Sequence, residues 1–287
     1  MHRVRLIALD MDGTLLLSDH HTVPQRNIDA IRKAHSMGIR VAISTGRMLE
    51  DASDFVRRYD LPCMIIAANG ARASDAPLPQ GNVIYRSNLR PEDAHAALDL
   101  LIPTGLVIHG FEDGVVHTAG DCKGQKYHLV YRGLIEDRYG EATIREAADR
   151  GLMKIFAVGD GFAGDEYDPR IVPTKKIVEE ALPHLQITSS GAGNIEVIAP
   201  EAGKGQTLDR VARHFGLLRE NVMAMGDAGN DLSMLRYAYH SVAMGNATQD
   251  VLAACRYTTA SNDDCGVALM IEQVIEQARL HREGEYA

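Results

Sequence analysis

Short, almost uninterrupted apolar runs alternate with helix-patterned segments along much of this 287-residue chain. The runs lie at residues 4–9, 39–43, 63–68 and 222–225. Runs of this kind are typical of strands that helices cover on both faces of a parallel sheet. Between them, apolar residues recur at helical spacing, as at Leu208, Val211 and Ala212, and Gly216 follows where that helix is expected to end. The alternation predicts a doubly wound, Rossmann-like α/β sheet with right-handed crossovers.

The pattern changes between residues 84 and 190. Here the sequence predicts a helix at residues 91–101, a hairpin of residues 106–109 and 115–117, a strand at 153–158 and a helix at 175–182. We interpret residues 84–190 as an inserted cap domain of mixed α+β type. The core domain then consists of residues 1–83 and 191–287, and residues 185–189 and 194–198 are expected to return the chain to it. An amphipathic helix from about Gly266 to Arg282 is expected to pack on the core sheet.

Charge and composition exclude several classes of protein. A formal net charge of -9 argues against a protein that binds nucleic acid or anionic membranes, because both use basic surfaces. No apolar stretch is long enough to cross a membrane, and Asp10 and Asp12 interrupt the apolar start before a signal-peptide core is complete. The four cysteines contain no Cys-x-x-Cys pair, so we expect reduced thiols and a cytoplasmic protein.

Polar residues follow the apolar runs at the points where the strands are expected to end. They are Asp10, Thr45, Asn69 and Asp227, in the order of the runs. The carboxyl ends of parallel strands meet at one edge of a sheet, which is where open α/β sheets bind ligands. Each of these residues is also common in turns. Their coincidence at one edge predicts a ligand site there.

Asp10 and Asp12 are two positions apart at a strand end, so both carboxylates can project toward one side. Two close carboxylates repel each other unless a cation lies between them or one stays protonated. Magnesium suits such a site, because it is a hard ion that takes a few carboxylates and keeps positions for water and phosphate. Asp227 and Asp231 complete the acidic group, although a pair at this spacing can also complement a helix dipole. A calcium loop is excluded, since Gly13 directly follows Asp12.

A phosphate monoester bound at such a site has a route to hydrolysis. One carboxylate attacks phosphorus and forms an aspartyl-phosphate, while the other protonates the leaving alkoxide and then deprotonates the attacking water. The phosphoryl oxygens need positive partners in the transition state, which a lysine, a hydroxyl and backbone N–H groups can supply. Lys204, Thr45 and the turn around Gly13 fit these roles.

Together the clusters resemble the motifs of the haloacid dehalogenase-like phosphatases. The matching segments are Asp-Met-Asp-Gly-Thr-Leu at 10–15, Ser-Thr-Gly-Arg at 44–47, Asn-Gly-Ala at 69–71, Lys-Gly at 204–205, Gly-Asp-Ala-Gly-Asn-Asp at 226–231 and Met-Gly-Asn-Ala at 244–247. The long insert between the Arg47 and Lys204 motifs resembles the type II cap subfamily, often called Cof-type. The resemblance implies a Mg²⁺-dependent phosphomonoester hydrolase that acts on a small phosphorylated metabolite, such as a sugar phosphate.

The resemblance also implies a role for each matching residue. Asp10 is the expected nucleophile and Asp12 the expected acid/base. Magnesium is expected to bind Asp10, Asp227 and the backbone carbonyl of Asp12, with Asp231 at the same metal site. The expected phosphate-binding residues are Thr45, Lys204, Gly13, Arg47, Asn69 and Asn230. For Arg47 and Asn69, a part in cap closure is an alternative.

Two positions depart from the family pattern: Gly203 stands where serine is often found, and Cys265 where an acidic residue is common. Two other functions share the same clusters. A phosphomutase would pass the aspartyl-phosphate group to a second sugar hydroxyl, and a phosphate-sensing switch would carry the group without turnover. The sequence gives no indication of oligomeric state.

Overall fold

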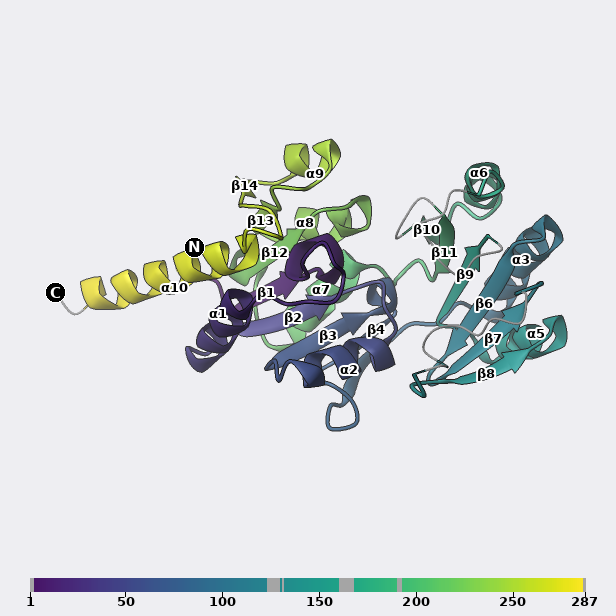
Figure 1. Cartoon of the computed structure of the whole chain (residues 1–287), viewed down its shortest axis with the longest axis horizontal. Coiled ribbons are helices and arrows are strands. Elements are labelled where there is room, and N and C mark those ends of the chain that lie inside the picture. Colours follow the sequence, from purple (N-terminus) through teal and green to yellow (C-terminus); the bar gives the residue numbers. More distant parts are fainter. Residues whose placement is uncertain (1–2, 123–129, 131, 160–167, 190–192, 286–287) are drawn as a thin grey trace. The chain divides into compact units, whose positions relative to one another are not determined.

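The structure is a computed structural model that describes residues 3–122, 130, 132–159, 168–189 and 193–285. The chain forms two compact units. The first, which we call the core unit, consists of residues 1–85 and 204–287, and the second, the cap unit, consists of residues 86–203. Figure 1 shows the elements of each unit around its own sheet.

The core unit is built on an eight-stranded sheet in the order β14-β13-β12-β1-β2-β3-β4-β5. The strands are β1 (Leu6–Leu9), β2 (Arg40–Ser44), β3 (Cys63–Ala67), β4 (Arg72–Ser74), β5 (Val83–Arg86), β12 (Val222–Gly226), β13 (His240–Ala243) and β14 (Tyr257–Thr258). From β14 to β3 all neighbouring strands are parallel, and β4 runs antiparallel to β3. Strand β1 is central, with Leu9 opposite both Met225 of β12 and Ile43 of β2. The predicted doubly wound α/β sheet is confirmed.

Helices flank this sheet. They are α1 (Gln25–Ser36), α2 (Leu49–Arg58), α7 (Lys204–His214), α8 (Leu232–Tyr237), α9 (Gln249–Ala254) and α10 (Gly266–Glu285). Helix α1 packs against α10, and α7 against α8. The apolar positions that predicted helix α7 are buried, as with Leu208 and Val211. Within the described residues, no helix combines the length and the apolar character that a membrane crossing needs.

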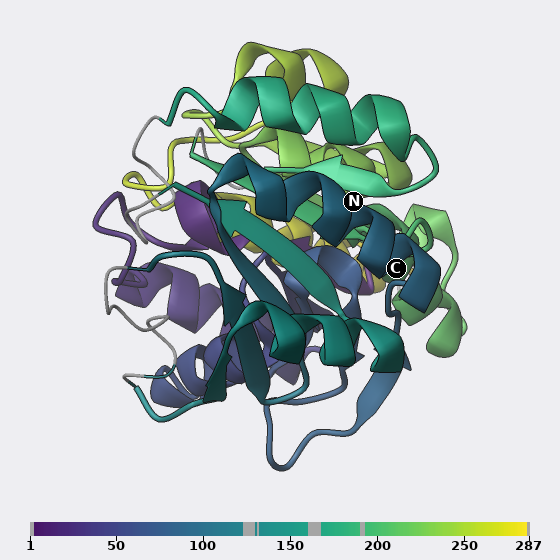
Figure 2. The ribbon, with the colours of Figure 1, turned by 90° about the vertical axis from the view of Figure 1, so that its right-hand side faces the viewer.

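The cap unit has a six-stranded sheet in the order β10-β11-β9-β6-β7-β8, antiparallel except for the β7–β8 pair. Its elements are α3 (Pro91–Leu101), β6 (Val107–Glu112), β7 (Val115–Ala119), β8 (Glu136–Tyr139), α5 (Glu141–Arg150), β9 (Lys154–Val158), α6 (Ile171–Ala181), β10 (Gln186–Thr188) and β11 (Asn194–Ile198). Helices α3, α5 and α6 pack on one face of the sheet, and Figure 2 views the unit from their side. Gly110 of β6 lets α5 approach closely, because a Cβ there would lie 2.7 Å from Ile144.

The boundaries of the cap unit differ from those expected. Strand β11 pairs with β9 and β10, so it belongs to the cap sheet, and the chain divides at 203/204 instead of 190/191. The first division falls at 85/86 instead of after residue 83. The run at 194–198 is short and completely buried, as strands of either sheet can be. Its sequence therefore does not indicate which sheet it joins.

Candidate active site

Several loops of the core unit begin where neighbouring parallel strands end. Asp10 follows β1, and its backbone N–H donates to the carbonyl of Met225 on β12 at 3.1 Å. Thr45 follows β2, and its N–H donates to the carbonyl of Ile66 on β3 at 2.8 Å. Asp227 follows β12. This is the edge of the sheet where the sequence predicted a ligand site.

Lys204, the first residue of α7, is the charged centre of the site. Its side chain is 1% exposed, and its Nζ lies 2.5 Å from Oδ1 of Asp10 and 2.7 Å from Oδ1 of Asp231. Burial lowers the pKa of Lys204, but attraction to the two carboxylates outweighs this effect and raises the pKa above its ordinary value. Burial, and next repulsion by Asp231, raise the pKa of Asp10 well above its ordinary value, although Lys204 opposes this shift. The site therefore holds a buried triad of one lysine and two carboxylates.

A third carboxylate joins this triad. Asp10, Asp227 and Asp231 offer oxygens that all lie within 4.8 Å of one another. Burial, and next repulsion by Asp231, raise the pKa of Asp227 to about 6, while a hydrogen bond from the Thr14 hydroxyl at 2.8 Å opposes this shift. Because three carboxylates share one lysine, a bound cation would relieve their repulsion. Oxygen ligands of this kind suit a hard divalent ion, so the residues fit a magnesium site.

Within this cluster, Asp231 is already held by the chain. Its Oδ1 accepts a hydrogen bond from Lys204, and its Oδ2 accepts from the backbone N–H groups of Asp227 at 3.0 Å and Ala228 at 3.2 Å. A carboxylate engaged in this way is suited to orienting Lys204 and the loop after β12. Asp10 and Asp227 would then be the main direct ligands of a metal.

The turn after β1 requires glycine at position 13. Gly13 has a φ of +77°, and a Cβ on it would overlap the carboxylate of Asp227. The carbonyl of Gly13 accepts a hydrogen bond from Nδ2 of Asn246 at 2.8 Å. Asn246 and Thr14 therefore fix this turn and the adjacent carboxylate, which are roles that the sequence analysis did not assign. Their presence within the matching motifs was the only signal that could have found them.

The turn after β3 packs against the turn after β2. The N–H of Asn69 donates to the carbonyl of Thr45 at 3.0 Å, and the N–H of Ala68 donates to the carbonyl of Arg47 at 2.7 Å. Ala68 and Asn69 have φ values of +49° and +52°, a left-handed backbone that is strained for residues other than glycine. The side chain of Asn69 is buried against Gly46, where a Cβ would lie 3.1 Å from its Oδ1. Asn69 therefore shapes the loop that carries Thr45.

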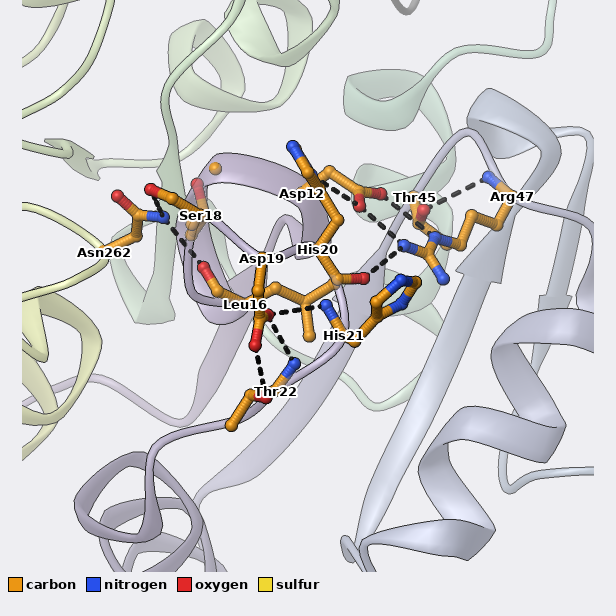
Figure 3. A network of polar contacts seen from close by, with 12 residues as sticks. Asp12, Leu16, Ser18, Asp19, His20, His21, Thr22, Thr45, Arg47 and Asn262 are labelled. Carbon is orange, nitrogen blue, oxygen red and sulfur yellow. Dashed lines mark hydrogen bonds and ion pairs between the residues drawn. The ribbon is translucent and has the colours of Figure 1, made fainter. Parts of the chain in front are cut away.

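Arg47 contacts Asp12, a pair that the sequence analysis did not predict (Figure 3). Its Nε donates to Oδ2 of Asp12 at 3.0 Å, and its Nη2 donates to Oδ1 at 2.6 Å. The carboxylate of Asp12 is not a member of the acidic cluster formed by the described residues. A magnesium contact through its backbone carbonyl stays a prediction. Asn230, the remaining expected phosphate ligand, lies half-buried in the turn Gly229–Asp231.

A Rossmann-like core with an inserted cap, and a lysine among carboxylates at the carboxyl edge of its sheet, form an arrangement suited to phosphoryl transfer. The chain belongs to the haloacid dehalogenase-like hydrolase family, whose model matches residues 7–271. The resemblance inferred from the motifs is thereby confirmed.

Relatives of this chain are named phosphatases. The chain is 30% identical to the 5-amino-6-(5-phospho-D-ribitylamino)uracil phosphatase YwtE of Bacillus subtilis, over 99% of this chain and 100% of that protein. It is 29% identical to the HMP-PP phosphatase of Cronobacter sakazakii, with 87% of each chain covered. Among solved structures, the subclass IIB sugar phosphatase BT4131 is similar with a TM-score of 0.77 at 26% identity, over 94% of this chain and 98% of that one. The chain is an enzyme of the phosphatase class.

Replacing Asp227 with Asn is expected to stabilise the metal-free chain at neutral pH. The pKa of this carboxyl is about 6 in the folded chain and 3.8 ordinarily, so the unfolded chain releases the proton first as the pH rises. The folded state therefore loses stability between about pH 4 and about pH 6, and above this range the loss amounts to about 3 kcal/mol, which Asn removes. Urea unfolding of the metal-free proteins at about pH 4 and about pH 7.5 measures this difference.

At the lower pH the two proteins should differ much less, because Asp227 is protonated in the folded chain and only about half ionised in the unfolded chain there. Mg²⁺ should then stabilise the wild type at neutral pH and leave the variant unchanged. Equal stability of both proteins at both pH values, with equal responses to Mg²⁺, would show that Asp227 carries neither the repulsion nor the metal contact.

Proposed function

We propose that this chain hydrolyses phosphate monoesters of small metabolites through an aspartyl-phosphate on Asp10, with Mg²⁺ as its cofactor. The observation that supports this function most strongly is the buried contact of Lys204 with Asp10 and Asp231, beside Asp227. Lys204 holds Oδ1 of Asp10, which leaves Oδ2 for attack. Asp10, Asp227 and the backbone carbonyl of Asp12 would hold the ion, which supplies positive charge to the phosphoryl oxygens when bound.

The chain's own residues account for each bond that changes. Asp10 attacks phosphorus, the bond from phosphorus to the leaving oxygen breaks, and Asp12 gives its proton to that oxygen. Asp12 then takes a proton from water, whose oxygen attacks the same phosphorus and releases inorganic phosphate from Asp10. Thr45, Lys204 and the N–H groups of the turn around Gly13 are the donors for the phosphoryl oxygens. The hydroxyl of Thr45 accepts a hydrogen bond from the N–H of Arg47 at 3.1 Å, and its own proton serves as a donor.

The relatives support a small phosphorylated substrate. The Bacillus subtilis relative is named for a phosphorylated ribitylaminouracil, and the Cronobacter sakazakii relative is named for HMP-PP. We carry over only what these names share, a small phosphorylated compound, with sugar phosphates among the candidates. The proposal includes a cytoplasmic location. All four cysteines lie within the described residues and are free, as expected in a reducing compartment.

Phosphate release tests the proposed function. Purified protein with Mg²⁺ is expected to release inorganic phosphate from p-nitrophenyl phosphate and from members of a panel of sugar, nucleotide and cofactor phosphates. Removal of the metal with EDTA should slow the release at least about 100-fold. A phosphomutase would instead yield an isomerised sugar phosphate without inorganic phosphate. Release that is equally fast in EDTA would overturn the role of Mg²⁺, and no release from any compound would overturn the hydrolase.

A further inference from the structure

We propose that Arg47 is a positioning residue that fixes the carboxylate of Asp12 for proton transfer to the leaving group. This inference rests on the proposed function, because Asp12 acts there as the acid/base. It replaces the expected contact of Arg47 with the substrate phosphate. The two roles differ in which substrates lose reactivity when the guanidinium is removed.

The pair has the geometry of a bidentate fork. Two adjacent nitrogens of Arg47 each donate to a different oxygen of Asp12, at 3.0 Å and 2.6 Å. Such a fork fixes both the position and the plane of a carboxylate, which one point contact does not. Asp12 needs this fixing, because its side chain is 41% exposed whereas that of Asp10 is 8% exposed. An exposed carboxylate without the fork would lose the orientation that proton transfer requires.

Arg47 is itself held on several sides. Its N–H donates to the hydroxyl of Thr45 at 3.1 Å, and its carbonyl accepts from the N–H of Ala68 at 2.7 Å. Its Nη1 lies 3.7 Å from Oδ2 of Asp51, which is buried on α2. The guanidinium thus lies between two carboxylates while its backbone is fixed by two neighbouring turns. A residue constrained in this way can position another.

The loop of residues 18–22 lies beside the pair of Arg47 and Asp12, as Figure 3 shows. The carboxylate of Asp19 accepts hydrogen bonds from the N–H groups of His21 and Thr22, each at 2.8 Å, and closes this loop on itself. The carbonyl of His20 accepts from Nη2 of Arg47 at 3.5 Å, and Nδ1 of His20 lies 3.7 Å from Oδ1 of Asp12.

The far side of this loop is tied to the start of α10. The Ser18 backbone N–H and hydroxyl donate to Asp263 at 2.9 Å and 2.7 Å. Nδ2 of Asn262 donates to the carbonyl of Leu16 at 2.9 Å. The loop and Arg47 therefore hold Asp12 in place, and both belong to the core unit.

The fork leaves Asp12 able to act. Each carboxylate oxygen has two lone pairs, and Arg47 uses one on each oxygen. The remaining sites can carry the proton that moves to the leaving oxygen. Loss of Arg47 should therefore slow the reaction in proportion to the leaving group's need for a proton. An alkyl phosphate such as a sugar phosphate needs one, whereas p-nitrophenolate leaves without it.

The test compares Arg47→Met and Arg47→Lys with the wild type on both substrates. For the alkyl phosphate, kcat/KM of Arg47→Met should fall about 100-fold, and for p-nitrophenyl phosphate less than about 5-fold. We use kcat/KM because it reports the step in which the leaving group departs. Arg47→Lys should stay within about 3-fold of Arg47→Met on the alkyl phosphate, since lysine keeps the charge but lacks the fork.

Arg26→Met is the matched control. Arg26 forms the same kind of fork with Glu272, at 2.9 Å and 2.7 Å, on the surface of α1 and α10. Its loss should leave kcat/KM of both substrates within about 2-fold of the wild type. In addition, Arg47→Met in an Asp12→Asn background should reduce kcat/KM for the alkyl phosphate no further, because the group that Arg47 positions is already absent.

Other outcomes separate the hypotheses. An equal loss on both substrates, seen as a raised KM, would assign Arg47 to the substrate phosphate and overturn the inference while leaving the hydrolase intact. An Arg47→Lys variant as active as the wild type would also overturn it, since charge alone would then suffice. Absence of phosphate release by the wild type would instead reject the proposed function itself.

Discussion

An Asp10→Asn variant is expected to lose at least about 10⁴-fold in kcat while its fold stays intact. The amide keeps the size of the side chain and the oxygen that Lys204 contacts at 2.5 Å, but it lacks the nucleophilic carboxylate. Burial, and next repulsion by Asp231, raise the pKa of Asp10 well above its ordinary value, so the ionised form is disfavoured where it lies. Neutral Asn removes that repulsion. The metal-free variant should therefore unfold at a temperature equal to or above that of the wild type.

Asp209→Asn provides the matched control for this experiment. Asp209 lies on α7 and pairs with Arg213 at 2.9 Å on the surface of the helix. The same chemical change at this position should leave phosphate release within about 2-fold of the wild type. If Asp10→Asn and Asp209→Asn turned over equally fast, the nucleophile would have to be another residue.

Lys204→Met is expected to affect both stability and catalysis strongly. Its ammonium lies between Asp10 and Asp231 at 2.5 Å and 2.7 Å, and all three side chains are buried. Removing one partner of such a buried group leaves charges without compensation and costs about 3–5 kcal/mol. The nucleophile also loses the positive charge beside it, so kcat/KM should fall about 10²–10³-fold. Urea unfolding without metal and phosphate release with Mg²⁺ measure the two effects.

A second substitution separates stability from catalysis. Asp231→Asn in the Lys204→Met background removes one of the two uncompensated carboxylates, so it should restore about half of the lost stability or more. It should restore no activity, since the lysine is still absent. A Lys204→Met protein as stable and as active as the wild type would show that the buried triad contributes to neither property.

The strands of the core were predictable because helices cover both faces of the sheet. Strands β1, β3 and β12 are completely buried, and this burial produced the continuous apolar runs by which they were found. The assignment of β11 to a sheet was not predictable. Its five residues are equally buried, but their pairing with β9 is a long-range contact that local pattern does not encode.

The candidate site shows the same division between local and long-range information. Asp10 and Asp227 could be placed at one edge from the order of strands, because a parallel sheet brings such ends together. The pair of Arg47 with Asp12 could not, since it joins side chains 35 positions apart whose directions depend on two turns. Likewise Asn246 reaches the carbonyl of Gly13 across 233 positions. The residue types predicted the chemistry of these groups, whereas their hydrogen-bond partners are seen only in the folded structure.

The identity of the residue that carries the phosphoryl group is the central question. The protein is quenched in acid during turnover and treated with borohydride, which reduces a phosphorylated aspartate to homoserine. Peptide mass spectrometry then locates the homoserine in the sequence. With substrate and Mg²⁺, we expect homoserine at position 10 in the wild type and none in the Asp10→Asn variant. Homoserine at any other aspartate, or none in wild-type protein quenched while it releases phosphate, would contradict an aspartyl-phosphate on Asp10.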